Sequence, residues 1–213
     1  VQQVKKRGVY SFCMCPGGFI VPAATAKGEL VVNGMSPSKR NNLYANSGIV
    51  VEINVHQDIP KYDHFGALKG LEYQKNLEKL AFTAGGRTQT APAQRLTDFV
   101  DGTLSNTLSD SSYQPGLKSA PLHSLLPKII GGRLRTGLKE FGKKMNGYYT
   151  EEANVIGVES RTSSPVSIPR KENLEHTEIE GLYPCGEGGG YAGGIVSAAM
   201  DGERCAEAAI KEY

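Results

Sequence analysis

The sequence has 213 residues, of which 39% are hydrophobic, 22% are charged and 8% are aromatic, and its formal net charge at pH 7 is +2. This composition is typical of a folded globular domain and excludes disordered and fibrous classes, and a chain of this length buries roughly 70% of the surface it exposes when unfolded. So small a net charge does not favour nucleic acid or an anionic membrane as a partner. The N-terminus has no apolar signal segment and no run approaches the roughly 20 apolar residues that span a bilayer, so we expect a cytoplasmic protein.

The first 55 residues predict a block of antiparallel strands. Four segments are rich in Val, Ile and aromatic residues: 9–12, 19–26, 29–33 and 48–55. Lys27-Gly28 offers a turn between the second and third of them. The segment 35–47 combines Ser, Asn, Pro and basic residues without a hydrophobic period, so we expect an exposed loop there.

Helical spacing is typical of the middle of the chain. We predict a helix over residues 65–84 and a short one over 92–100, with Pro92 in its first turn. A third helix has the strongest pattern, because apolar residues recur at intervals of three or four: Leu126, Ile130, Leu134, Leu138, Phe141 and Met145. Its basic residues are interpreted as a solvated face; contact with nucleic acid is the alternative. Residues 101–121 are predicted to form a surface loop, and 154–160 and 165–168 to form strands.

The last residues combine a predicted short strand, a glycine-rich loop and a helix. The strand covers 181–185, the loop 186–194 and the helix about 195–211, with small residues along one helix face. Such a junction can bind a negative or electron-rich group, because free backbone N–H groups and the positive end of the helix dipole converge there. The alternative is a purely structural turn between strand and helix.

Residues 188–193 also satisfy the G-x-G-x-x-G pattern of dinucleotide-binding proteins. That fingerprint needs a following strand with an acidic residue about 20 positions on, within a βαβ unit. The chain stops at Tyr213, so we do not interpret the match as a pyrophosphate site.

Three separated motifs resemble a family of bacterial FAD-dependent dehydrogenases, largely uncharacterised. They are LYPCGEGGGYAGGI at 182–195, GVYSFCMCPGG at 8–18 and TSSPV at 162–166. In that family a preceding segment holds the ADP half of FAD, an inserted domain covers the flavin and a C-terminal segment completes the fold. The resemblance therefore implies an α+β cap or substrate domain of antiparallel strands and packed helices over 1–173. It implies a flavin-contacting segment of an incomplete FAD-binding domain over 174–213.

The resemblance also implies cofactor-binding residues in the tail. Glu187 would accept a hydrogen bond from a ribityl or ribose hydroxyl, and backbone N–H groups near Gly194 and Ile195 would face the pyrimidine edge of the flavin. Gly186 and Gly193 are also expected to be cofactor-binding residues. The parent is then an FAD-dependent oxidoreductase with NAD(P)H as a candidate electron donor. Its N-terminal FAD-binding portion is the expected partner of this chain, which we expect to be inactive alone.

Catalytic residues are not identified by the sequence. Cys13 and Cys15 are candidates for a redox pair or a substrate contact, although a C-x-C pair closes a disulfide poorly and cysteines often behave as small apolar residues. The scattered cysteines and histidines do not have the spacing of a metal site. The alternative function is a non-enzymatic ligand- or protein-interaction domain in which the glycine loop is structural.

Overall fold

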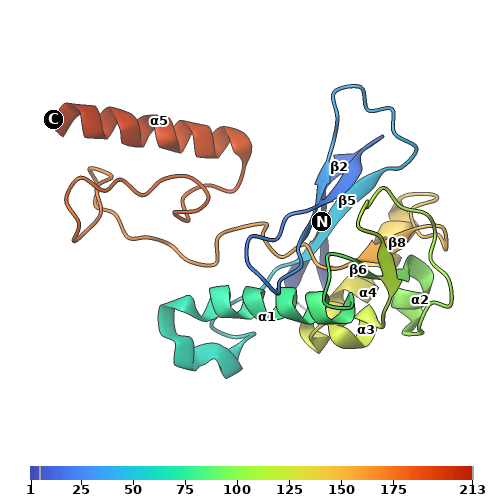
Figure 1. Cartoon of the computed structure of the whole chain (residues 1–213). Helices are drawn as coiled ribbons and strands as arrows, with labels where there is room; N and C mark the ends of the chain where they lie inside the picture. Colours follow the sequence, from blue (N-terminus) through green and yellow to red (C-terminus); the bar gives the residue numbers. More distant parts are fainter. Residues whose placement is uncertain (5, 213) are drawn as a thin grey trace. The chain divides into compact units, whose positions relative to one another are not determined.

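The computed structural model describes residues 1–4 and 6–212, with the side chain of Glu212 excepted, so Tyr213 of the predicted 174–213 segment lies outside the described residues. The chain divides into two compact units (Figure 1). The first comprises Val1–Asp58 and Gln74–Ser160, and the second Ile59–Tyr73 and Arg161–Tyr213. Short sheets and several helices make an α+β fold, as the sequence predicts.

The predicted block of antiparallel strands is confirmed. One sheet has the order β1 (Gln2–Val4), β2 (Arg7–Cys15) and β5 (Asn46–Val51), and a separate hairpin pairs β3 (Phe19–Pro22) with β4 (Val32–Met35). The strand expected over 19–26 ends at Pro22, and one further backbone hydrogen bond follows it, from Ala23 N to Val31 O at 2.8 Å. Leu30 is fully buried although it precedes β4, and its N–H donates to the carbonyl of Glu78 at 3.1 Å. The return strand therefore starts later than the sequence predicts.

A third sheet corrects the predicted helix at 92–100. Its order is β7 (Leu117–Ser119), β6 (Ala91–Arg95) and β8 (Asn154–Ile156), with β6 parallel to β7 and antiparallel to β8. Pro92 lies in β6, where its carbonyl accepts a hydrogen bond from Gly157 N at 3.0 Å that it cannot return. The helix α2 (Leu96–Asp101) begins only after this strand.

The region 101–121 is not the surface loop that the sequence predicts. It contributes β7 to the third sheet, and Tyr113 is only 3% exposed, with its hydroxyl donating to Gln89 O at 2.7 Å. Ser105 is also buried and donates to Asp98 at 2.6 Å. Polar residues are buried here because each hydroxyl has a partner, which composition alone does not reveal.

The predicted helix at 65–84 spans both units. It is a 3₁₀ segment η1 (Pro60–Leu68), which lies in the second unit and contains the positive φ of Gly66, followed by α1 (Lys69–Ala84), whose residues 74–84 belong to the first unit. The short α3 (Leu122–Leu125) precedes α4 (Lys128–Lys144), whose buried Leu134, Leu138 and Phe141 confirm the predicted apolar face. A Cβ on Gly137 would lie 2.6 Å from Cγ1 of Val9, so α4 approaches β2 through a glycine. This packing closes the core of the unit.

The second unit ends in α5 (Ile195–Glu212), which confirms the predicted C-terminal helix. The strands expected at 165–168 and 181–185 are wrong, because these segments belong to no strand; one isolated bridge joins Arg170 to His176. Their backbone groups bond instead to the glycine loop and to side chains. Among the described residues, no helix is both long and apolar enough to cross a bilayer.

Candidate functional site

The glycine loop over 186–194 packs against the segment 162–168. Ile168 N donates to Gly189 O at 3.0 Å, and the Ser164 hydroxyl contacts Val166 O at 2.7 Å and Gly188 O at 3.4 Å. A Cβ on Gly190 would lie 2.7 Å from Val166 O, so glycine permits this close approach. Two of the three motifs singled out in the sequence therefore meet within one unit.

A buried ion pair joins Arg170, in the segment before the loop, to Asp201 of α5. Arg170 binds Asp201 with both terminal nitrogens, at 3.0 and 2.8 Å, and the two side chains are 10% and 8% exposed. Asp201 also accepts from Gly186 N at 2.9 Å, while Arg170 donates to Pro184 O at 2.9 Å. Hydrogen bonding from Arg170 holds the pKa of Asp201 below its ordinary value. The pair thus holds Pro184 and Gly186, the residues through which the chain enters the loop.

Tyr191, inside the loop, contacts Arg170 and Ile168. The guanidinium carbon of Arg170 lies 3.6 Å from the centre of the Tyr191 ring, a cation–π contact. Tyr191 N donates to Gly186 O at 3.0 Å, and its hydroxyl donates to Ile168 O at 2.8 Å. Arg170, Asp201 and Tyr191 therefore hold the loop together with the contacts from the segment 162–168.

The predicted cofactor-binding residues form the outer edge of this loop. Gly186 is half-buried and bonded to Asp201, whereas Glu187, Gly193, Gly194 and Ile195 are exposed, Ile195 by 92%. The first helical hydrogen bond of α5 runs from Ala198 N to Gly194 O, so the N–H groups of 195–197 are not used by the helix. No acidic side chain lies in the first turn to compete for them. The edge is therefore an open surface on which N–H donors are available to an electron-rich group.

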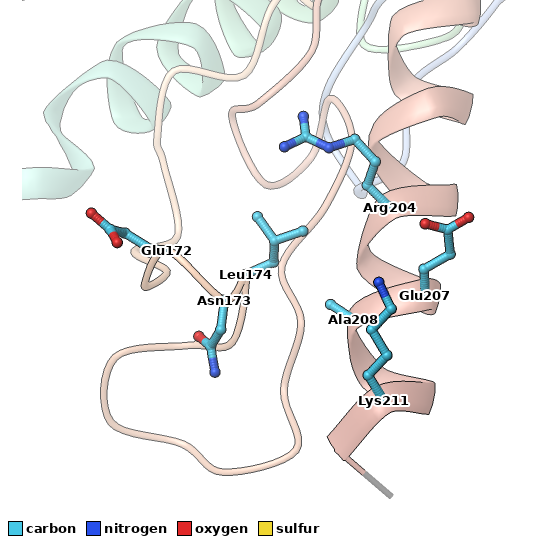
Figure 2. A pocket seen from close by; sticks show the side chains of 7 residues that line it. All are labelled: Glu172, Asn173, Leu174, Arg204, Glu207, Ala208 and Lys211. Carbon is cyan, nitrogen blue, oxygen red and sulfur yellow. The ribbon is translucent and has the colours of Figure 1, made fainter.

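A cavity of about 350 Å³ lies elsewhere in the same unit, between residues 172–174 and α5 (Figure 2). Two acidic and two basic side chains line it together with Asn173, Leu174 and Ala208: Glu172, Glu207, Arg204 and Lys211. None of the predicted cofactor-binding residues reaches it. Its mixed charge indicates no ligand class, so we do not assign a site there.

Cys13 and Cys15 occupy an irregular part of β2. The register with β5 shifts between Phe12 and Cys15, and Cys13 has a φ of 47°. Cys13 is exposed, whereas Cys15 is buried with its thiol donating to Cys13 O at 3.3 Å, and both are free thiols. Desolvation and the charge of Glu159 raise the pKa of the Cys13 thiol. This environment favours the protonated thiol over the reactive thiolate.

Glu159 is a neighbour of Cys13 that sequence reasoning missed. Its Oε2 would lie 2.6 Å from a Cβ on Gly48, so the carboxyl occupies the space that this glycine leaves open beside the Phe12 ring. Burial raises its pKa above the ordinary value. An acidic residue directly after the apolar run 155–158 was the available signal, but its partners on β2 and β5 are distant in sequence.

Replacing Glu159 with glutamine should increase the reactivity of Cys13. At pH 8 the substitution removes a nearby negative charge that disfavours the thiolate, so we expect alkylation by iodoacetamide to accelerate by about twofold or more. Peptide mass spectrometry measures the rate at Cys13 against Cys185, an exposed thiol in the other unit. An unchanged rate at Cys13 would show that the two groups do not interact.

Acid should loosen the loop from α5. The pKa of Asp201 lies below its ordinary value of 3.8, so the unfolded state binds the proton more readily than the folded state. The stabilisation is complete above that ordinary value and is lost as the pH falls below it through the folded-state pKa. Hydrogen exchange at Gly186, corrected for intrinsic rates and followed from about pH 5 to about pH 3, should show more frequent opening in acid. The Asp201→Asn variant should lack this pH dependence.

Comparisons with known proteins agree with the motifs. A family model described as "FAD-dependent protein, C-terminal domain-like" matches residues 1–162. An uncharacterized protein of Clostridium beijerinckii is 43% identical over 210 residues, which are 98% of this chain and 39% of that protein. The chain thus spans well under half the length of this relative. The family match contains Cys13, Cys15 and Glu159, whereas the glycine loop and α5 follow it.

Proposed function

Since the chain belongs to the FAD-dependent protein C-terminal domain-like family, we propose that it is the C-terminal part of a longer FAD-dependent oxidoreductase, a dehydrogenase. In this proposal residues 1–173 cover the flavin and shape the substrate site. Residues 174–213 contact the cofactor and complete a domain whose ADP-binding half belongs to the preceding portion of the polypeptide. The compartment is the cytoplasm in this proposal.

The observation that carries the proposal is the exposed loop edge at the start of α5. Glu187 and the backbone at Gly193 and Gly194 are accessible, and a Cβ added to Gly193 would meet no other atom within 4 Å. In the adjoining motif, the hydroxyl oxygen of Thr162 is buried without a hydrogen-bond partner among the described residues. An open edge with available donors fits a planar cofactor held between this chain and another part of the protein.

The chain's own residues would orient and tune the cofactor. FAD, when bound, would supply two-electron transfer. The N–H groups at the start of α5 would stabilise negative charge at the adjacent ring edge by about 0.3 to 1 kcal/mol. Glu187 would accept a hydrogen bond from a hydroxyl of the cofactor's sugar or ribityl chain. Arg170 and Asp201 do not touch the cofactor in this scheme; they hold the loop that does.

The absorption spectrum tests the proposal. We expect the longer protein to purify with flavin absorbance and this chain to be colourless, because in this proposal the ADP-binding half belongs to the preceding portion of the polypeptide. Anaerobic addition of NADH or NADPH should bleach the flavin band if either nucleotide is the electron donor. A longer protein that stays colourless after incubation with FAD would contradict the proposal and favour a non-enzymatic interaction domain.

A further inference from the structure

Two thiols of the second unit lie close together where the chain enters the glycine loop. Cys185 is exposed and directly precedes Gly186, whereas Cys205 of α5 is only 3% exposed, and both are free thiols. The Cys205 sulfur lies 3.9 Å from the carbonyl oxygen of Pro184, the residue before Cys185. An accessible thiol at the loop entrance is therefore a neighbour of an enclosed thiol on the helix.

A change of side-chain rotamer and a small shift of the loop can bring these thiols into bonding distance. A trans peptide plane places its carbonyl oxygen about 2.8 Å from the next Cα, so the Cys205 sulfur is at most about 7 Å from the Cα of Cys185. Disulfides join residues whose Cα atoms are usually about 4.4 to 6.8 Å apart. The Cys185 side chain is exposed, so it can change its rotamer without displacing packed atoms.

The surroundings give the two thiols different roles. Cys185 is exposed, so a dissolved peroxide reaches it first. Burial raises the pKa of the Cys205 thiol, and the charge of Arg170 opposes this effect. Arg170 also donates a hydrogen bond to the Cys205 sulfur at 3.3 Å, which stabilises negative charge on that sulfur when it attacks. Cys205 is therefore suited to react second, with an oxidised sulfur beside it, and not with an oxidant in solution.

We propose that Cys185 and Cys205 form a peroxide-oxidisable site that links the entrance of the glycine loop covalently to α5. Hydrogen peroxide transfers one oxygen atom to the Cys185 sulfur: the O–O bond breaks, a sulfenic acid forms and one water leaves. The Cys205 sulfur then attacks the Cys185 sulfur, so that the S–O bond breaks, the S–S bond forms and a second water leaves with the Cys205 proton. The two thiols lose two electrons and two protons in total, and the peroxide is reduced to two waters. This site goes beyond the proposed function and does not depend on it.

The disulfide replaces a reversible attachment with a covalent one. In the reduced chain, hydrogen bonds hold Pro184 and Gly186 to the buried ion pair, and they open whenever the loop leaves α5. In the oxidised chain, residues 185–205 form a closed ring that contains the whole glycine loop. The redox state of the pair thus decides whether the loop can separate from the helix.

The other two cysteines do not form a competing pair. Cys13 and Cys15 belong to the first unit and are separated by one residue, a spacing at which a disulfide closes poorly. The Cys15 thiol donates to the carbonyl oxygen of Cys13. These two thiols therefore serve as an internal comparison within the same chain.

Peptide mapping after oxidation tests the proposal. The reduced, folded chain is exposed to hydrogen peroxide, its remaining thiols are capped with N-ethylmaleimide, and it is digested without a reductant. We expect the main oxidised product to be a cross-link between Cys185 and Cys205 that dithiothreitol reverses. In Cys205→Ser the cross-link should be absent, and dimedone should trap Cys185 as its sulfenic acid. In Cys185→Ser, oxidation of Cys205 should be about tenfold slower than that of Cys185 in the unsubstituted chain, because Cys205 is buried.

A displaced thiol is the matched control. The double variant Cys205→Ser with Ala206→Cys moves the thiol by one residue along α5, to an exposed position about 100° further around the helix. Its yield of cross-link with Cys185 should be lower by about tenfold or more under the same conditions, because a disulfide has strict distance and direction requirements.

Three outcomes would overturn the proposal. One is accumulation of Cys185 sulfenic acid in the unsubstituted chain without a cross-link. Another is an equal yield of cross-link in the displaced variant, which would mean that general flexibility brings the sulfurs together. The last is a cross-link that forms only in urea, because the thiols then meet only in the unfolded chain. None of these outcomes depends on whether the longer protein binds flavin, so the proposed function is tested separately.

Discussion

Replacing Asp201 with alanine should release the glycine loop from α5 and is expected to be among the most disruptive single changes in the second unit. The substitution leaves the Arg170 guanidinium buried without its bidentate partner and removes the acceptor of Gly186 N. Breaking a buried pair by removing one partner typically costs about 3 to 5 kcal/mol. Hydrogen exchange over 186–194 should therefore accelerate by about 100-fold or more, since each 1.4 kcal/mol is about a factor of ten.

Two further variants show whether the pair itself is responsible. Asp110 is an exposed aspartate of the first unit, so Asp110→Ala should change stability by less than about 0.5 kcal/mol. The double variant Arg170→Met with Asp201→Leu should recover part of the loss, because apolar side chains of similar size can replace a buried pair. Acceleration of less than about tenfold in Asp201→Ala would mean that the loop is held by other contacts.

The importance of Asp201 was only partly accessible from the sequence. Small residues predicted one face of α5, yet Ala199 and Ala206 prove to be exposed, and Asp201 and Cys205 are the buried residues. A charged residue on a helix side otherwise occupied by small residues is a signal for a buried partner. It does not say that the partner is Arg170, 31 positions earlier in the chain.

Elements with local patterns were predicted well, and elements that depend on distant pairing were not. The apolar period of α4 is contained in its own sequence, so Leu134 and Leu138 identify both the helix and its buried face. By contrast, Pro92 is typical of the first turn of a helix but lies in β6, where pairing with β7 and β8 outweighs local preference. The reverse error occurred at 181–185, which has strand-like residues but no neighbouring strand.

The sequence located the candidate site in the chain, but it did not reveal the contacts that hold the site together. The glycine content of 186–194 correctly indicated a loop leading into a helix, and α5 begins at Ile195 as expected. The contacts from Ser164 and Ile168 to the loop join residues more than 20 positions apart, and no period or spacing reveals them. The same limit applies to Glu159 and Gly48 in the first unit.

Replacing Gly190 with alanine should deform the glycine loop and abolish most flavin binding by the longer protein. Gly190 has a φ of 84°, which disfavours an L-residue by about 1 to 2 kcal/mol. The added Cβ would also lie 2.7 Å from Val166 O and 2.9 Å from the Cα of Ser167. Both are backbone atoms, so the loop must separate from the 162–168 segment to accommodate it. We expect the flavin content after purification to fall by about tenfold or more, as the strain and the lost contacts together exceed about 1.4 kcal/mol.

Gly188 provides the matched control, two positions away in the same loop. A Cβ there meets nothing within 4 Å, and Gly188 is not among the residues with positive φ. Gly188→Ala should therefore keep the loop and, in the longer protein, a flavin content close to that of the unsubstituted form. If both variants retain flavin, the loop does not shape the cofactor site; if both lose it, the exposed edge is itself covered by the cofactor and tolerates no added methyl group. Loss in Gly190→Ala alone ties flavin binding to the packing of this loop on the 162–168 segment, because that packing is what distinguishes the two glycines.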